Sequence, residues 1–180
     1  ENCGRRELHF ICGKNPVSQE HGDLVLYFFP AAVCGVFSAR IPSNSPFFPN
    51  VLIRVSNIVV REYVQGENLY EYIQKKGLSY SLSKEIIDLL EDLKRLKFKR
   101  LNVRNAHIFI DSNEKIKVID PRKPYVKNTP YPKDIIKLLL KLKVFDKFLQ
   151  DLLNYRPDLL DYWIDGYNYV ANNYRHVLRY

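Results

Sequence analysis

The stretch Lys94–Lys123 constrains the fold of this chain more than any other, because three kinds of local pattern follow one another within it. A helical pattern ends at Phe98, and a polar loop covers residues 99–106. Two short apolar runs, His107–Ile110 and Ile116–Ile119, come next and are joined by the turn-rich sequence Asp-Ser-Asn-Glu. The second run stops at an aspartate that precedes a proline. This order predicts a helix, a polar loop and a β-hairpin whose second strand ends at the aspartate.

The patterns on the two sides of residue 64 differ, and they predict an α+β fold with a β-rich part, residues 1–64, and a mainly helical part, residues 65–180. The first part holds short runs of Val, Ile, Phe and Tyr between Gly, Pro and Asn, which is typical of strands. The predicted strands are Glu7–Cys12, Asp23–Phe29 and Val33–Arg40, with two more inside Val51–Val64. The second part shows apolar residues at helical spacing around the hairpin. The predicted helices are Glu67–Lys76, Ser83–Phe98 with Ser83 as its N-cap, Asp134–Leu142, Val144–Asn154 and the helical region Pro157–Tyr174.

Composition excludes two classes of protein and leaves the partner open. Of the 180 residues, 46% are hydrophobic, which is enough for a packed core and argues against a disordered chain. No uncharged apolar run is long enough for a transmembrane segment. The three cysteines form no C-x-x-C pair, so we expect structural thiols in a reducing, cytoplasmic setting. The net charge of +8 suits nucleic acid, a phosphorylated ligand or an anionic membrane surface, and a solvated basic helix face explains it equally well.

With this order laid out, the chain resembles a protein-kinase-like domain over residues 50–125. The sequence NIVVREYVQGENLYEYI resembles the strand, hinge and helix that join the two kinase lobes. RLNVRNAHIF lies over the catalytic-loop pattern H-R-D-x-x-x-x-N, and VIDPRK lies over the strand that ends in the D-F-G aspartate. The chain is similar to the small serine/threonine-kinase-like proteins of Bacillus-type bacteria and more distantly to RIO-type kinases. The resemblance implies two lobes, a reduced β-rich amino-terminal lobe and a mainly helical carboxyl-terminal lobe that carries the hairpin.

The resemblance also implies a catalytic loop with altered residues. Asn102 stands at the position of the catalytic aspartate, and Arg100 stands at that of the histidine. An asparagine can orient a hydroxyl group but cannot take its proton at neutral pH, and losing a general base costs about 10²–10⁴-fold in rate. Arg104 stands where many kinases place a phosphate-facing lysine, so it could neutralise the γ-phosphate. We therefore expect Asn102 and Arg104 at catalytic positions, and we expect Asn102→Asp to raise any transfer activity.

The cofactors that the resemblance implies are ATP and Mg²⁺. Asp120 keeps the D-F-G aspartate position and His107 replaces the metal-binding asparagine, so both are expected metal ligands. Mg²⁺ prefers oxygen ligands, whereas a histidine nitrogen suits a transition metal. The adenine is expected on the backbone groups of Glu62, Tyr63 and Val64, the implied hinge.

Arg40 is the nearest cation after a strand in the first part of the chain, and it is therefore the candidate for the nucleotide-binding lysine of kinases. Only a loop separates it from Val51, with no room for the helix that carries the lysine's glutamate partner. These departures predict a pseudokinase or a weakly active phosphotransferase that binds nucleotide or a protein partner. Two alternatives stay open: an active atypical ATP-dependent kinase, and a non-enzymatic basic domain that binds nucleic acid or an anionic surface.

Overall fold

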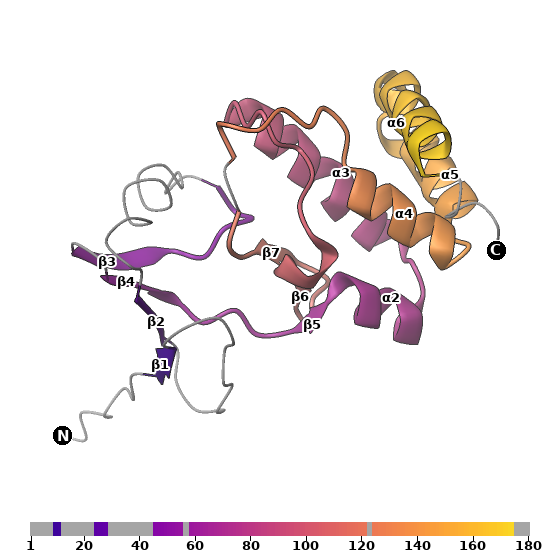
Figure 1. Cartoon of the computed structure of the whole chain (residues 1–180). Helices are drawn as coiled ribbons and strands as arrows, with labels where there is room; N and C mark the ends of the chain where they lie inside the picture. The colour runs from indigo at the N-terminus through magenta and orange to yellow at the C-terminus, as the bar shows by residue number, and fades with distance from the viewer. Residues whose placement is uncertain (1–8, 12–23, 29–44, 56–57, 122–123, 175–180) are drawn as a thin grey trace. The chain divides into compact units, whose positions relative to one another are not determined.

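The computed structural model describes residues 9–11, 24–28, 45–55, 58–121 and 124–174 of the chain. These residues form an α+β fold, and the chain divides into two compact units, Glu1–Val64 and Gln65–Tyr180 (Figure 1). The expected strand Val33–Arg40 and the three cysteines lie outside the described residues. The first unit carries one β-sheet, and the second carries another sheet together with all the helices among the described residues.

The sheet of the first unit has four strands. Their order is β1 (His9–Ile11), β2 (Leu24–Phe28), β4 (Ile58–Glu62) and β3 (Val51–Val55). β1 and β2 run parallel, and the other two neighbouring pairs are antiparallel. The β-branched residues of β3 and β4 favour extended backbone because they pack well on a pleated surface. The prediction of two strands inside Val51–Val64 is therefore confirmed.

The second unit joins a small sheet to a set of helices. The sheet is antiparallel, in the order β5 (Glu67–Asn68), β6 (Ile108–Ile110) and β7 (Ile116–Val118). The predicted hairpin is thus confirmed, with a shorter first strand because His107 belongs to a 3₁₀ turn. The helical elements are α2 (Leu69–Lys76), α3 (Tyr80–Arg95), η1 (Asn105–His107), α4 (Lys133–Lys141), α5 (Phe145–Tyr155), η2 (Pro157–Leu159) and α6 (Leu160–Asn173).

The N-cap of helix α3 lies four residues before the predicted N-cap Ser83, so that prediction was wrong. The N-cap is Ser79, whose Oγ accepts a hydrogen bond from the Leu82 backbone N at 2.9 Å. Ser83 is instead fully buried inside the helix, and its hydroxyl donates to Asp151 Oδ2 at 2.6 Å. The helix also ends at Arg95 rather than Phe98, because Lys97 adopts a left-handed backbone with φ of 58°. The spacing of apolar residues along the helix predicts neither the position of the cap nor the left-handed residue that follows the helix.

Gly66 is required where the chain enters β5. Its φ is +123°, a region that residues with a side chain rarely adopt. A Cβ atom at this position would lie 2.2 Å from the carbonyl oxygen of Ile110, which is a backbone atom of the neighbouring strand. Only glycine therefore allows β5 to approach β6 this closely, and β6 is the strand that follows the polar loop.

The core of the second unit forms around α3, which contacts both β7 and α5. The buried stripe of the helix comprises Leu82, Ile86, Leu89, Leu90 and Leu93. Ile108, Ile110, Ile116 and Val118 of the hairpin are buried as well. In the helices that follow, the rings of Phe148 and Trp163 pack with their centroids 4.5 Å apart. Because burial of each such side chain contributes about 1.5–3 kcal/mol, this shared core holds the hairpin against α3.

The tip of the hairpin is fastened to α2 and α3 by two glutamates. The Glu114 carboxylate accepts hydrogen bonds from Tyr72 Oη at 3.2 Å and from Ser79 Oγ at 2.7 Å. Burial, together with this bond to Glu114, raises the pKa of Tyr72 above its usual value. On α3, Glu85 accepts from Lys115 Nζ at 2.6 Å and from the Ile116 backbone N at 3.3 Å. These bonds fix the tip of the hairpin relative to α2 and α3. The two strands therefore also fix the position of its other end, where His107 and Asp120 lie.

Candidate functional site

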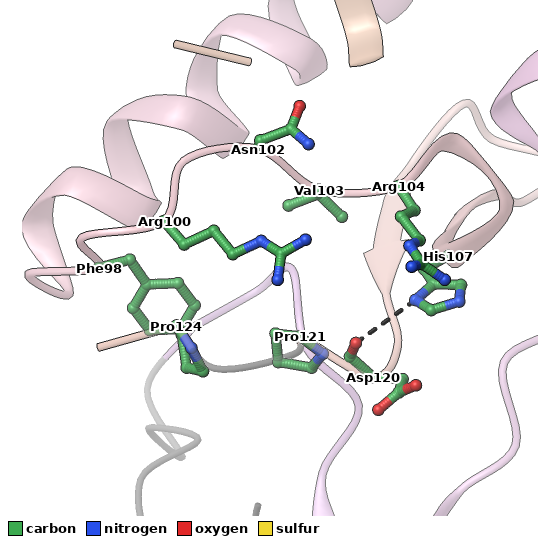
Figure 2. Close-up of a pocket in the computed structure, with 9 residues that line it drawn as sticks. All are labelled: Phe98, Arg100, Asn102, Val103, Arg104, His107, Asp120, Pro121 and Pro124. Atoms are coloured by element: carbon green, nitrogen blue, oxygen red, sulfur yellow. Dashed lines mark hydrogen bonds between the residues drawn. The ribbon is translucent and has the colours of Figure 1, made fainter. Parts of the chain in front are cut away.

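A pocket lies within the second unit, at the end of the hairpin remote from its tip (Figure 2). It is built by the loop after α3, the 3₁₀ turn η1, the residues after β7 and the proline-rich segment beyond them. The residues that line it are Phe98, Arg100, Asn102, Val103, Arg104, His107, Asp120, Pro121 and Pro124. Four of the residues that the sequence singled out, Asn102, Arg104, His107 and Asp120, therefore line one pocket.

The polar loop is held in place by the segment that follows the hairpin. The backbone N atoms of Lys99 and Arg100 both donate to the Pro124 carbonyl oxygen, at 2.9 and 3.0 Å. Leu101 N donates to the Thr129 carbonyl, and Thr129 N donates back to the Lys99 carbonyl, each at 3.0 Å. The described residues between Pro121 and Pro132 form turns and one isolated bridge, between Arg100 and Thr129. This irregular segment supplies the second wall of the pocket.

Asn102 has a partner that the sequence did not indicate. Its Nδ2 donates to Asp134 Oδ2 at 2.8 Å, and its Oδ1 accepts from the Asp134 backbone N at 2.8 Å. Asp134 lies in the first turn of α4, where backbone N–H groups lack partners within the helix. Asn102 is only 4% exposed, and both polar ends of its side chain are engaged by Asp134. Its amide thus ties the loop to α4.

Asn105 strengthens the same connection. Its Nδ2 donates to the Asp134 carbonyl oxygen at 3.0 Å, so two asparagines of the loop hold the start of α4. Asn105 Oδ1 is buried, and the described part of the chain gives it no hydrogen-bond partner. A buried acceptor without a partner costs about 1–3 kcal/mol. The loop therefore keeps this conformation at some expense in stability.

Two guanidinium groups line the pocket. Arg104 is exposed, and Arg100 is half-buried. In Figure 2 the Arg100 guanidinium extends across the pocket toward Pro121, whereas Arg104 enters from the end where His107 lies. The pocket thus carries two arginines and one carboxylate, that of Asp120. Such a lining favours an anion, and guanidinium groups bind phosphate oxygens through paired N–H donors.

Arg100 is the residue that sequence reasoning missed as a candidate for anion binding. The resemblance gave it the position of a motif histidine and no role of its own. A local signal was present, because Arg100 and Arg104 lie four residues apart in a polar loop that follows a basic helix end. The spacing alone could not show that both side chains reach one pocket, since the loop is not helical.

His107 and Asp120 meet through the backbone of Asp120. His107 Nδ1 lies 3.3 Å from the Asp120 carbonyl oxygen, the dashed line in Figure 2. Because a carbonyl oxygen only accepts, a hydrogen bond here requires the hydrogen on Nδ1 of the His107 ring. The neighbouring Ile119 N donates to the His107 carbonyl at 2.9 Å. Asp120 itself has a left-handed backbone with φ of 52°, an unusual conformation that occurs more often at functional sites.

Among the described residues, no group of three or more His, Cys, Asp or Glu side chains could hold a metal ion. The expected metal ligands His107 and Asp120 therefore supply two donors at most, one imidazole nitrogen and one carboxylate. A bound ion would need oxygen atoms of water or of a phosphate to complete its coordination. The metal-binding role of the pair stays a prediction.

The residues expected to bind the nucleotide base lie outside this pocket. Glu62, Tyr63 and Val64 end the first unit, whereas the pocket belongs wholly to the second. The Glu62 carboxylate accepts from Asn50 N at 3.0 Å and from Asn50 Nδ2 at 2.6 Å, and Tyr63 is exposed. Arg40 lies outside the described residues. The nucleotide-binding roles of these four residues stay predictions.

Comparison with known proteins gives no family for this chain. No protein-family model matches it, and no curated protein matches it. No described helix is both long enough and apolar enough to cross a membrane. The resemblance to kinases accordingly rests on the residues quoted above and stays a prediction.

Proposed function

We propose that this chain is a protein-kinase-like domain that binds the phosphate groups of ATP and transfers them weakly or not at all. In this proposal the β-rich unit is a reduced amino-terminal lobe, and the helical unit is the carboxyl-terminal lobe. The pocket of the second unit is then the place where the phosphates bind. The biological role would be that of a pseudokinase, in which nucleotide binding or contact with a protein partner replaces catalysis.

The observation that carries the proposal is the convergence of four residues on one pocket. Asn102, Arg104, His107 and Asp120 were selected because they occupy motif positions in the sequence, and they come from the loop, η1 and the residue two positions after β7. A chance match of the motif would not require these four residues to line the same cavity, as they do, although the Asn102 amide is bonded to Asp134. The kinase order of helix, loop, hairpin and aspartate gives a reason for this arrangement.

The chemistry of the pocket supports binding more strongly than transfer. Phosphoryl transfer depends on positioning and on neutralising charge, and Arg100 and Arg104 can supply both to a phosphate group. The position of the base holds Asn102, whose amide cannot accept a proton at neutral pH and already binds Asp134. Losing a general base lowers rates by about 10²–10⁴-fold. We therefore infer nucleotide binding with strongly reduced transfer.

Titration of the full chain with ATP and a divalent ion tests the proposal. We expect a rise in melting temperature and saturable binding by calorimetry in the wild-type protein. Arg104→Gln should weaken this binding about tenfold, equivalent to about 1.4 kcal/mol. Lys99→Gln is the matched control, because Lys99 is an exposed cation of the same loop that does not line the pocket. Equal loss of affinity in both variants, or no binding at millimolar ATP, would contradict the proposal.

A second candidate function is favoured by the basic side of α4. Lys133, Lys137 and Lys141 recur every four residues and therefore share one face of the helix. The centroid of the Tyr174 ring lies 3.1 Å from Lys137 Nζ, and the Tyr174 hydroxyl oxygen lies 3.1 Å from Lys133 Nζ. A lysine stripe bordered by an aromatic ring suits a nucleic acid or another polyanion. Such binding would weaken steeply with salt, whereas a solvated helix face would bind no polyanion.

A further inference from the structure

Helices α5 and α6 lie next to each other, and two ring contacts show which side of each helix faces the other (Figure 1). The rings of Phe148 and Trp163 have their centroids 4.5 Å apart, and those of Phe145 and Tyr167 stack at 5.6 Å. A step back along α5 thus corresponds to a step forward along α6, so the two helices are antiparallel. In an antiparallel pair, residues that follow these rings by the same number of positions lie on the same side of the pair.

The core of the second unit covers one side of this pair. On α5, Asp151 accepts a hydrogen bond from Ser83 of α3 at 2.6 Å. On α6, a Cβ atom added to Gly166 would lie 2.8 Å from the Ile136 side chain of α4. Asp151 and Gly166 each lie three positions after the ring residue of their helix, so α3 and α4 contact the same side of the pair. The opposite side faces away from this core.

That opposite side carries a row of apolar side chains. Leu149 and Ile164 follow the ring residues by one position, and Leu153 and Leu160 lie one turn away from them on the same helix faces. Leu153 is 47% exposed, Ile164 is 37% exposed, and the other two are half-buried. We call these four residues the outer strip. Single apolar residues on a surface are ordinary, whereas a contiguous row over two helices is typical of a binding surface.

Negative charge borders the outer strip. Asp146 lies one turn before the strip on α5, and Asp161 and Asp165 lie beside Ile164 on α6. These three aspartates are exposed, and none of them has an ion-pair partner in the described part of the chain. Residues 145–173 hold five aspartates against one lysine and one arginine, a net charge of −3 in a chain whose net charge is +8. The surface is therefore acidic and apolar in an otherwise basic protein.

This combination of charge and shape favours one kind of occupant. The aspartates would repel an anionic membrane surface. A second copy related by two-fold symmetry would bring the same aspartates together, because such an interface pairs a patch with itself. Two rows of apolar side chains on neighbouring helices leave a groove that another helix fills with residues at spacings of three and four. A helix that carries lysine or arginine beside those residues complements both the strip and its border.

We propose that the outer strip and its three bordering aspartates bind a basic amphipathic helix of a partner protein. The inference is independent of nucleotide binding, because no residue of the strip lines the pocket. Leu149 and Leu153 are four residues apart, which is about 6 Å along the axis of α5, so a partner helix of two to three turns covers both rows. Apolar contact supplies the affinity, and the aspartates select basic partners and orient them.

The probe for this surface is a fluorescent peptide of leucine and lysine, with leucine at spacings of three and four and a length of about 18 residues, enough to form a helix. We expect saturable binding to the full chain by fluorescence anisotropy, with lower affinity at higher salt. Leu153→Asn and Ile164→Asn should each weaken binding at least tenfold, and both positions are exposed, so the fold should persist. Asn154→Gln is the matched control, because Asn154 is an exposed residue of α5 outside the strip.

The acidic border is tested by the double variant Asp161→Asn with Asp165→Asn. It should bind the peptide more weakly than the wild type and with a smaller dependence on salt, whereas Glu71→Gln, at an exposed position on α2, should behave as the wild type. A second peptide with glutamate in place of lysine should bind at least tenfold more weakly than the basic one. This arm does not depend on the stability of the apolar variants.

Equal binding of the two peptides, or unchanged binding of the basic peptide in both Leu153→Asn and Ile164→Asn, would overturn the inference. Sedimentation of the chain alone provides a further check. A dimer that dissociates in Ile164→Asn would show that a second copy covers the strip, and it would also overturn the inference. Titration with ATP keeps this inference apart from the proposed function, because the strip variants should bind ATP as the wild type does. Peptide binding without any ATP binding would support the docking surface and contradict the proposed function.

Discussion

Asn102 and Asp134 hold each other by two hydrogen bonds across 32 residues of sequence. The Asn102 amide donates to the Asp134 carboxylate, and the Asp134 backbone N donates to the Asn102 carbonyl oxygen, both at 2.8 Å. This pair joins the polar loop to the first turn of α4. It also changes what a substitution at position 102 is expected to do.

Asn102→Asp should destabilise the protein rather than repair a catalytic site. The substitution replaces an N–H donor by an oxygen that faces the Asp134 carboxylate. We expect the free energy of unfolding at pH 7 to fall by about 1–3 kcal/mol. The like charges also raise the pKa of one carboxyl in the folded variant, so the loss should shrink as pH falls through that raised pKa. Urea denaturation at pH 7 and at about pH 4.5 measures both effects.

The control for this substitution is Asn113→Asp, at an exposed position in the hairpin turn. We expect it to change stability by less than about 0.5 kcal/mol. The kinase resemblance alone predicts that Asn102→Asp raises transfer activity. A variant that is as stable as the wild type and gains transfer activity would favour that prediction over the role that Asn102 has in the structure.

Gly66→Ala should be strongly destabilising, because it combines an unfavourable backbone with a clash. The new Cβ would lie 2.2 Å from the Ile110 carbonyl oxygen, so β5 and β6 would have to move apart. We expect a loss of more than about 2 kcal/mol in the free energy of unfolding. Gly77→Ala is the matched control, since its φ of +76° is also left-handed but nothing lies within 4 Å of the added atom. It should cost less than Gly66→Ala, about 1–3 kcal/mol, because only the backbone conformation is unfavourable. Equal losses in thermal melts would contradict the proposed close approach of the two strands.

Tyr72→Phe tests the contact that fastens the hairpin tip. Removing the hydroxyl takes one donor from Glu114, and we expect a loss of about 0.5–1.5 kcal/mol at pH 8. The raised pKa of Tyr72 means that its hydrogen bond stabilises the folded state below the usual tyrosine pKa and is lost as pH rises through the raised value. The stability difference between wild type and variant should therefore disappear at strongly alkaline pH. A difference that persists there would contradict the hydrogen-bonded phenol.

Local patterns in the sequence were sufficient to predict the hairpin and most of the helices. Turn residues separate the β-branched runs that became β6 and β7, and the apolar stripe of α3 is buried as expected. The start of α3 was not predictable in this way, because three serines, at positions 79, 81 and 83, lie where the helix begins. Ser79 caps the helix, and Ser83 is buried because its hydroxyl has a partner in Asp151, 68 residues later. Such a choice depends on tertiary packing rather than on propensity.

The candidate site likewise contains residues that the sequence predicted and residues that only the structure revealed. Motif order was enough to group Asn102, Arg104, His107 and Asp120, which do line one pocket. It gave no indication of Asp134, because the only local signal there is an acidic residue in the first turn of a helix. It also gave no role to Arg100, whose side chain enters the pocket because backbone bonds to Pro124 fix the loop. Contacts between distant segments determined both.

Hydrogen–deuterium exchange of the full chain with and without ATP and a divalent ion tests the central claim most directly, because it locates the binding site. The account predicts slower exchange in residues 99–107 and 118–121, which form the pocket, and also in residues 62–64, the implied hinge. Helix α5 (Phe145–Tyr155), which contributes no pocket residue, should exchange at the same rate in both states. Slower exchange confined to α4, with its lysine stripe, would instead support a polyanion-binding surface. Saturating nucleotide that leaves residues 99–107 unprotected would contradict the proposal.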